Sequence, residues 1–371
     1  MNKKIWRRRN SGLLLASLVL VFSASLGAGG EPAQLSVKGN PKAIGRRFGE
    51  KFGKTIQELH PTFLRTACFM RREKPKQIYT ECRRIARFLK RSDREEIKAL
   101  ARASGMKYEE VLFLNLFYTL IGDRLFCRQI AVWGKNTKDG ELLHGRNLDW
   151  NDYPGRPLAK THLILRVEPE GGVPYVSLTW PGLIGVITGT NKKGLTVAFN
   201  KLPAGEEDGG GEPVFFTIRR ILRSCGSTKE AVQVLRKAKP PESGSILISN
   251  ARRKTAVVVE MIDRKLKVRR PAEGSISNAN HSATDFDIRG VRKGNADWPL
   301  GTVAERMGGP FDVESMKRAL RHKDVLQNIN LLSVVLKPSE GKMYLATGEV
   351  PAAEGKFREY SLFSGETSGG L

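Results

Sequence analysis

Three residues with chemical potential lie close together in the segment FCRQIAVWGKNTKDGELLHGRNLDW, residues 126–150. Cys127 opens an apolar run, and Arg146 and Asp149 follow in a Gly-Arg-Asn-Leu-Asp string. Free cysteine is among the most buried residue types, so Cys127 on its own could be a core thiol. A free thiol has a pKa of about 8.5, so little of it is nucleophilic thiolate at neutral pH. A catalytic Cys127 therefore needs a base and a cation beside it.

Cleavage of the Phe126–Cys127 bond would supply that base. The new α-amine would have a pKa of about 7.7–8.0, so it could take the proton of its own thiol. Cys127 lies where a helical pattern gives way to the first strand-like run, a junction that could be a cleavable loop. Arg146 would stabilise the thiolate and Asp149 would orient the amine. In a regular strand this spacing points the two side chains to opposite faces, so a turn or bulge must bring both to the site.

These residues resemble a known family, the N-terminal nucleophile (Ntn) hydrolases of the peptidase C45 group. These are the acyl-coenzyme A:6-aminopenicillanic acid acyltransferase-like proteins, distantly related to acid ceramidase, N-acylethanolamine acid amidase and choloylglycine hydrolase. The string DGELLHGRNLDW, residues 139–150, resembles the family's DG-x-x-x-x-GRN-x-D segment. Four other segments agree with the family in sequence order: residues 39–53, 96–115, 185–200 and 277–281.

The resemblance implies a role for each candidate site residue. Cys127 would be the nucleophile and the new N-terminus after autocatalytic cleavage. Arg146 and Asp149 would bind and orient it. Asn280 would donate to the oxyanion, and Asn200 would be a second polar contact. From the residues alone both asparagines could instead serve turn chemistry. The reaction implied by the resemblance needs no cofactor and no metal.

The chain departs from the family's pattern in two places. Arg128 and Gln129 follow the nucleophile, where many relatives have Ser or Thr. A long cation at this point could lower the pKa of the thiol or narrow the acyl pocket, so the substrate stays open. A late arginine used by some relatives has two candidates here, Arg289 and Arg292.

The elements that must position these residues change character along the chain. From Pro41 to Gly122 apolar residues recur at helical spacing. After Phe126 the pattern predicts strands, interrupted by helices at 213–224 and 228–238. The strand-like runs are residues 127–133, 161–167, 174–180, 183–189, 194–200, 245–249, 255–261, 265–269, 331–336 and 342–346. This order predicts an α+β fold, and the resemblance implies the four-layer αββα sandwich of Ntn hydrolases with a helical N-terminal region.

The first 30 residues have the pattern of a secretory signal. Five Lys/Arg precede an apolar run from Leu13 to Leu26, and small residues follow it. This run is shorter than the roughly 20 residues of a transmembrane helix. We therefore expect a signal peptide at 1–30 and a periplasmic or extracellular protein. Residues 31–126 would form a small helical fragment, and 127–371 the catalytic domain. After cleavage the two should stay associated, because the helices must bury their apolar faces.

Charge and the remaining cysteines leave alternatives open. The net charge of +25 is compatible with an anionic envelope surface or with a solvated surface, and the basic residues are spread along the chain. The sequence has no nucleic-acid-binding signature. Cys68 and Cys82 could form a disulfide in an oxidising compartment. No Cys/His spacing suits zinc.

The sequence thus predicts a self-processing cysteine Ntn amidohydrolase or acyltransferase. It would cleave a linear N-acyl amide, a small molecule, through an acyl-thioester on Cys127. The acyl chain and amine stay open among N-acyl amino acids, N-acyl-homoserine lactones, fatty amides and β-lactam side chains. One alternative is an inactive exported protein that binds an anionic envelope polymer. Another is an unprocessed Cys-His hydrolase that uses Cys127 or Cys225, with His144 or His281 as the tempting histidines.

Overall fold

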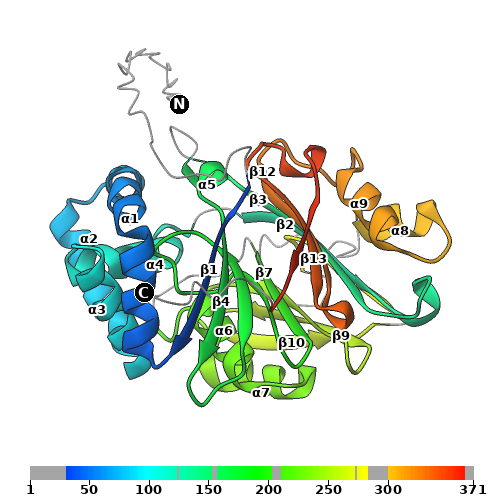
Figure 1. Cartoon of the computed structure of the whole chain (residues 1–371), viewed down its shortest axis with the longest axis horizontal. Helices are drawn as coiled ribbons and strands as arrows, with labels where there is room; N and C mark the ends of the chain where they lie inside the picture. Colours follow the sequence, from blue (N-terminus) through cyan, green and yellow to red (C-terminus); the bar gives the residue numbers. More distant parts are fainter. Residues whose placement is uncertain are drawn as a thin grey trace, which may run out of the picture.

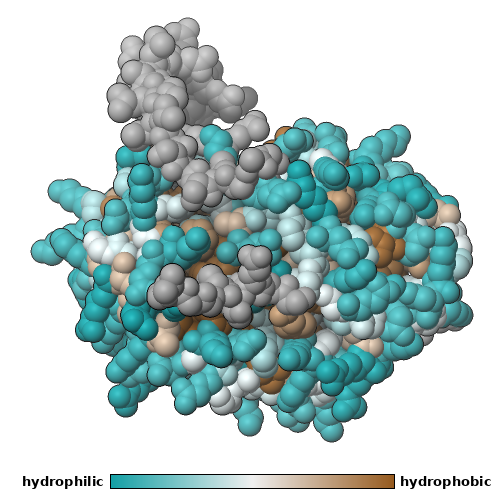
Figure 2. Space-filling view, in the orientation of Figure 1, coloured by the Kyte–Doolittle hydropathy of each residue, from teal (hydrophilic) through white to brown (hydrophobic). Residues whose placement is uncertain are grey.

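The computed structural model describes residues 31–122, 125–152, 157–202, 210–271, 274–282 and 300–363. The predicted signal segment 1–30 and both candidate late arginines, Arg289 and Arg292, lie outside these ranges. Within the described ranges, no helix is both long enough and apolar enough to cross a bilayer. Figure 2 shows that hydrophilic residues cover most of one face of the molecule, in line with charge spread along the chain.

The N-terminal segment forms a cluster of helices beside the sheets (Figure 1). The cluster contains α1 (Pro41–Arg71), α2 (Pro75–Ile85), α3 (Arg91–Ala103) and α4 (Tyr108–Ile121). The side chain of Asn40 caps α1 by accepting a hydrogen bond of 3.0 Å from the Ala43 N–H, and Pro41 occupies the first turn. Short 3-10 turns lie at η1 (Ala86–Phe88), η2 (Gly134–Asn136), η3 (Pro338–Glu340) and η4 (Ala352–Glu354).

Glycines at four-residue spacing let α1 lie against α3. A Cβ atom at Gly45 would lie 2.2 Å from the carbonyl oxygen of Glu96, and one at Gly49 would lie 2.6 Å from that of Leu100. Gly53 meets the same helix end at 2.9 Å from a backbone carbon. Real Cβ atoms do not come this close, so the Gly-rich start of α1 is required by backbone contact between the two helices.

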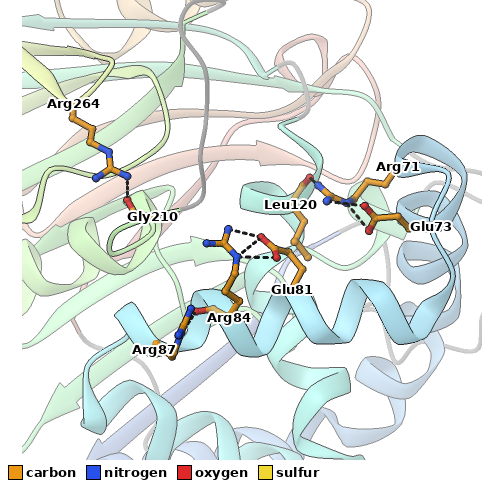
Figure 3. Close-up of polar contacts among 8 residues, drawn as sticks. All are labelled: Arg71, Glu73, Glu81, Arg84, Arg87, Leu120, Gly210 and Arg264. Carbon is orange, nitrogen blue, oxygen red and sulfur yellow. Dashed lines mark hydrogen bonds and ion pairs between the residues drawn. The ribbon is translucent and has the colours of Figure 1, made fainter.

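Polar contacts fix the end of α1 to the end of α4 (Figure 3). Arg71 pairs with Glu73 at 3.0 Å and donates a hydrogen bond of 2.8 Å to the Leu120 carbonyl. On α2, Arg84 pairs with Glu81 at 2.6 Å. The contact with Leu120 satisfies a carbonyl of the last turn of α4, shortly before the chain enters β2.

In the described part of the chain, one sheet has eight strands in the order β1-β4-β5-β6-β7-β8-β9-β10. β1 pairs with β4 in parallel, and the other neighbours are antiparallel. The strands are β1 (Ala33–Gly39), β4 (Leu163–Pro169), β5 (Tyr175–Thr179), β6 (Thr188–Asn191), β7 (Leu195–Lys201), β8 (Gly244–Asn250), β9 (Thr255–Ile262) and β10 (Lys265–Arg269).

The other sheet has six strands among the described residues, in the order β11-β2-β3-β12-β13-β14. All of its neighbours are antiparallel. Its strands are β2 (Leu125–Val132), β3 (Leu143–Trp150), β11 (Ser275–Asn278), β12 (Asn330–Lys337), β13 (Lys342–Thr347) and β14 (Arg358–Ser361). β2 and β3, which carry the nucleophile and the GRNLD string, are central neighbours in this sheet.

The two sheets face each other between outer helices (Figure 1). β2 and β11 contact β7, β8 and β9 across the interface. α6 (Val214–Ser224) and α7 (Thr228–Ala238) cover the eight-stranded sheet, and α8 (Leu300–Met307) and α9 (Val313–Arg321) cover the six-stranded one. The short α5 (Pro157–Lys160) follows β3 along the chain. The predicted α+β fold with an αββα sandwich is confirmed.

Three details differ from the sequence predictions. The N-terminal segment is not only helical, because β1 adds a parallel strand to the eight-stranded sheet. The Phe126–Cys127 bond lies inside β2, paired with β3, and not in a loop. The strand predicted at 183–189 begins only at Thr188. Before it, the N–H groups of Ile184 and Val186 bond to Asn115 of α4 and Phe215 of α6, so these residues are not free to join a sheet. Cys68 and Cys82, considered above as a disulfide, are both free thiols here.

Candidate active site

The Cys127 thiol lies in the sandwich interior beside a buried guanidinium. Cys127 is fully buried on β2, and its Sγ accepts a hydrogen bond from Arg146 Nη2 on β3 at 3.4 Å. Arg146 Nη1 donates to the Phe199 carbonyl on β7 at 3.1 Å. The guanidinium is therefore held between the nucleophile strand and the opposite sheet, with its charge directed at sulfur.

The main chain of Cys127 is held by side chains as well. Its N–H donates to Asn280 Oδ1, and its carbonyl accepts from Asn200 Nδ2 at 3.3 Å and Arg128 Nη1 at 3.1 Å. The second group of Asn280, Nδ2, donates to the Lys201 carbonyl at 2.7 Å. Asn280 thus presents an oxygen to the nitrogen that cleavage would turn into the α-amine. Its oxyanion role stays a prediction.

Gln129 is a site residue whose role the sequence did not indicate. It lies two residues after Cys127 on the same face of β2. Its Nε2 donates to Asn200 Oδ1, which leaves Asn200 Nδ2 to point at the Cys127 carbonyl. The sequence marked Gln129 only as a departure from the family pattern.

Asp149 of β3 lies opposite an irregularity in the neighbouring strand β12. Asn330 of β12 is in register with Asp149, but Leu332 pairs with Leu148, so Leu331 is an extra residue in β12. The turn or bulge expected between Arg146 and Asp149 is absent from β3, which pairs with β2 in unbroken register, and the bulge lies in β12 instead. Asp149 is fully buried, and its Oδ1 accepts a hydrogen bond of 2.8 Å from Asn330 Nδ2.

Burial sets the protonation of both reactive groups in the uncut chain. It raises the pKa of the Cys127 thiol, against the opposing charge of Arg146, a backbone hydrogen bond from Asp149 and the charge of Arg128. It raises the pKa of Asp149 to about 7, against the hydrogen bond from Asn330 and the charges of Arg128 and Arg146. Before cleavage, burial therefore favours the protonated form of both the thiol and the carboxyl.

An apolar pocket of about 40 Å³ lies next to this centre, at the boundary between the N-terminal helices and the sheets. Its lining includes Leu59, Phe63 and Tyr118 from the helices and Trp150, Trp180 and Phe215 from the remainder of the chain. Trp150 directly follows Asp149. The Tyr118 ring also packs on Phe199, whose carbonyl holds Arg146, with ring centroids 5.8 Å apart. The pocket is thus one layer of side chains away from the reactive groups.

The alternative Cys-His pairs find no support at His144 or Cys225. His144 Nδ1 lies 2.9 Å from Ser249 Oγ, and burial lowers the pKa of His144 to about 3, so the ring is neutral and faces β8. Cys225 ends α6, and its Sγ lies 3.6 Å from Ser224 Oγ. His144 is therefore a structural side chain of β3.

Comparison with known proteins gives one family match and several distant relatives. The model of the family acyl-coenzyme A:6-aminopenicillanic acid acyl-transferase matches residues 135–344, a range that includes Arg146, Asp149, Asn200 and Asn280 and begins after Cys127. The N-acylethanolamine-hydrolyzing acid amidase of Caenorhabditis elegans is 24% identical over 288 residues, 70% of this chain and 77% of the relative. Protein dcd1A of Dictyostelium discoideum is 28% identical over 146 residues, 37% of this chain and 33% of the relative. Acid ceramidase of Bos taurus is 25% identical over 169 residues, 39% and 41% of the two chains.

Solved structures in the same comparison are remote. The Caenorhabditis elegans amidase ortholog has a TM-score of 0.47 and 21% identity, and the match covers 64% of this chain and all of that one. The conjugated bile acid hydrolase of Clostridium perfringens has a TM-score of 0.41 and 15% identity, with 66% and 100% coverage. The family model spans more than half of the chain and includes the GRNLD string. The chain belongs to the acyl-coenzyme A:6-aminopenicillanic acid acyl-transferase family.

Proposed function

We propose that this chain is a self-processing thiol enzyme that hydrolyses linear N-acyl amides or transfers their acyl group, with Cys127 as the nucleophile. One observation carries the proposal: the sulfur, nitrogen and carbonyl oxygen of Cys127 are each held by a side chain. These are Arg146 on sulfur, Asn280 on nitrogen, and Asn200 on the carbonyl oxygen. A buried structural thiol needs none of these contacts. Family membership supports the enzyme class.

Self-processing uses the thiol of the uncut chain. The Cys127 sulfur attacks the carbonyl carbon of Phe126, the C–S bond forms, the C–N bond breaks, and the thiol proton ends on the new α-amine. Water then hydrolyses the thioester, which releases the Phe126 carboxylate and the free thiol. The Phe126–Cys127 bond lies within β2, so the attacking sulfur and the attacked carbonyl belong to neighbouring residues of one strand.

Turnover uses the same sulfur with the new amine as its base. The α-amine takes the thiol proton, the thiolate attacks the substrate carbonyl, and the α-ammonium returns the proton to the leaving amine. Arg146 stabilises the thiolate, and Asp149 holds the ammonium. Water releases the acyl group in a hydrolase, and a second amine releases it in a transferase.

The side chains that line the apolar pocket favour an apolar acyl group, and at about 40 Å³ the pocket must widen to admit more than a very short one. Aromatic and aliphatic side chains from the N-terminal helices and from the catalytic part line it together. The substrate would bind with its acyl chain against Tyr118 and Trp150 and its amide carbonyl at Cys127. Both fragments are then needed for substrate binding, which agrees with their predicted association.

Gel analysis of the purified protein tests the proposal. Wild type should give two bands that comigrate under native conditions, with Cys127 as the sequenced N-terminus of the larger. Cys127→Ala should stay one chain. The processed protein should release a chromogenic amine from an N-acyl amide, and iodoacetamide should abolish the release. A wild-type protein that stays uncut and inactive after long incubation, yet binds an anionic polymer in a salt-sensitive way, would favour the binding-protein alternative.

A further inference from the structure

We infer that Asn330 is a positioning residue that holds the Asp149 carboxylate toward the amine of Cys127. This inference rests on the proposed function. Asn330 begins β12 and is fully buried. Its position before an ordinary apolar strand run does not indicate a functional role.

The hydrogen bonds of Asn330 fix which way its amide points. Its Oδ1 accepts from the Ala353 N–H at 2.9 Å. Its Nδ2 must therefore face the other way, where it donates to Asp149 Oδ1 at 2.8 Å. The same nitrogen lies 3.1 Å from the Leu332 carbonyl and 3.3 Å from the Leu148 carbonyl. The three groups that Nδ2 faces are all acceptors, so a flipped amide would set oxygen against oxygen.

This arrangement occupies one carboxylate oxygen and leaves the other for catalysis. Asp149 Oδ2 is buried and has no hydrogen-bond partner among the described residues. A buried acceptor without a partner is costly in a purely structural carboxylate. It is the expected state of an oxygen that receives the α-ammonium only after cleavage. The bulge at Leu331 places Asn330 opposite Asp149, so the hydrogen bond between these two side chains depends on the sheet distortion.

Asn330 also favours the ionised form of Asp149. The charged groups acting on this carboxyl are Arg128 from β2 and Arg146 from β3, and Asn330 is the neutral donor from β12. The Asn330 hydrogen bond is the largest of the effects that lower the pKa of Asp149 against burial. Its loss should raise that pKa further. Since the reaction needs the carboxylate, the acid limb of the pH profile should then move to higher pH.

A neighbouring asparagine provides a matched control. Asn147 of β3 is equally buried, and its Nδ2 donates to the Leu320 carbonyl at 2.8 Å. Its Oδ1 accepts from Ser333 Oγ at 2.7 Å. It therefore ties the same strands to α9, and neither of these hydrogen bonds involves Asp149. Asn147→Ala should lower stability and leave the pH profile of the enzyme in place.

The test compares kcat/KM against pH for a chromogenic N-acyl amide in wild type, Asn147→Ala and two Asn330 variants. Asn330→Asp keeps the shape and the acceptor for Ala353 but sets a carboxylate against Asp149. Asn330→Ser is smaller, and its hydroxyl is too short to reach Asp149. We expect both to move the acid limb upward by about one pH unit or more, which is a tenfold loss or more on that limb.

Outcomes for the two proposals differ. An unshifted acid limb in Asn330→Asp and Asn330→Ser, with lowered thermal stability as in Asn147→Ala, would overturn the positioning role and leave the proposed function intact. If one variant does not fold, the other decides. A wild-type protein that neither processes nor turns over would instead overturn the proposed function, before any variant is compared.

Discussion

Arg146 Nη2 on β3 lies 3.4 Å from Cys127 Sγ on β2, and the other terminal nitrogen of Arg146 is bonded to the carbonyl of Phe199 on β7. The Arg146 side chain therefore links the nucleophile, on the six-stranded sheet, to the eight-stranded sheet that faces it. Burial has the largest effect on the pKa of the Cys127 thiol and raises it. The charge of Arg146 has the next largest effect and lowers that pKa, which favours the thiolate. The arginine acts through its fork of donors, since a single charged nitrogen cannot make both contacts.

Arg146→Lys should lower kcat by about 100-fold or more, because the point charge of lysine cannot serve Sγ and the Phe199 carbonyl together. Steady-state kinetics on the processed enzyme would measure this. Arg166→Lys is the control, since Arg166 is also buried but bonds to the Leu362 carbonyl far from the site. Equal loss in both variants would mean that the defect is one of folding.

Asp149→Asn should also lower kcat by about 100-fold or more. Asparagine keeps the shape of the side chain but removes the charge that holds the α-ammonium. Rates should be measured on protein whose N-terminus at Cys127 has been verified, so that a processing defect is not counted as a catalytic one. Near wild-type turnover would make the GRNLD aspartate a structural residue.

The same substitution should stabilise the uncut chain at high pH. Burial raises the pKa of Asp149 to about 7 in the folded state, above its unfolded value of 3.8. The folded state thus holds a proton that the unfolded state releases, so this group destabilises the fold as pH rises between these values. In a Cys127→Ala background, Asp149→Asn should raise the free energy of unfolding at pH 8 by up to about 4 kcal/mol, and by little at pH 4. Urea unfolding at both pH values checks this. A pH-independent difference would contradict it.

Asn280→Ala should lower turnover by about 10²–10³-fold with a smaller change in KM, if Asn280 acts in the transition state. Asn280→Asp separates the two roles of this amide. Aspartate keeps an oxygen toward the Cys127 nitrogen but has no N–H for an oxyanion. Loss in Asn280→Ala alone would indicate that the oxygen acts on the amine, and equal loss in both would indicate oxyanion donation.

Arg219→Met should weaken the association of the two fragments. Arg219 of α6 is buried and donates to Asp93 at 2.6 Å and Glu96 at 2.5 Å, both on α3. Its removal leaves two buried carboxylates without their cation, at a cost of about 3–5 kcal/mol. Size-exclusion chromatography of the processed protein in urea should show earlier dissociation. Arg220→Met is the control, because its ion-pair partner Glu212 lies in the same fragment and the pair does not join the two fragments.

The fold could be predicted where local signals are strong. α7 was expected at 228–238 and spans Thr228–Ala238, because Ser227 caps it and one face is apolar. The strand β1 cannot be predicted from its own residues, because its partner, β4, lies far along the chain. Local pattern carries no information on such a partner.

The site residues, too, fall into those that the sequence could predict and those that it could not. Cys127, Arg146 and Asp149 could be chosen from residue type and motif spacing, and the structure places all three together. Asn330 and Gln129 could not, because their roles come from strand register: one faces Asp149 across a bulge, and the other supports Asn200. Asn330 is a polar residue next to an apolar run, and nothing in the sequence indicates which side chain it would contact.

The parallel pairing of β1 with β4 affects how the protein would refold before and after cleavage. β1 precedes the proposed cut before Cys127 and β4 follows it. A processed molecule would therefore contain a sheet assembled from two separate polypeptides. While the chain is intact, covalent connection keeps β1 at high effective concentration beside β4. Cleavage between Phe126 and Cys127 would abolish that advantage, although the cut is not in β1 or β4. The mature enzyme would then show hysteresis: durable once formed, yet unable to regain its structure from denaturant as readily as its precursor.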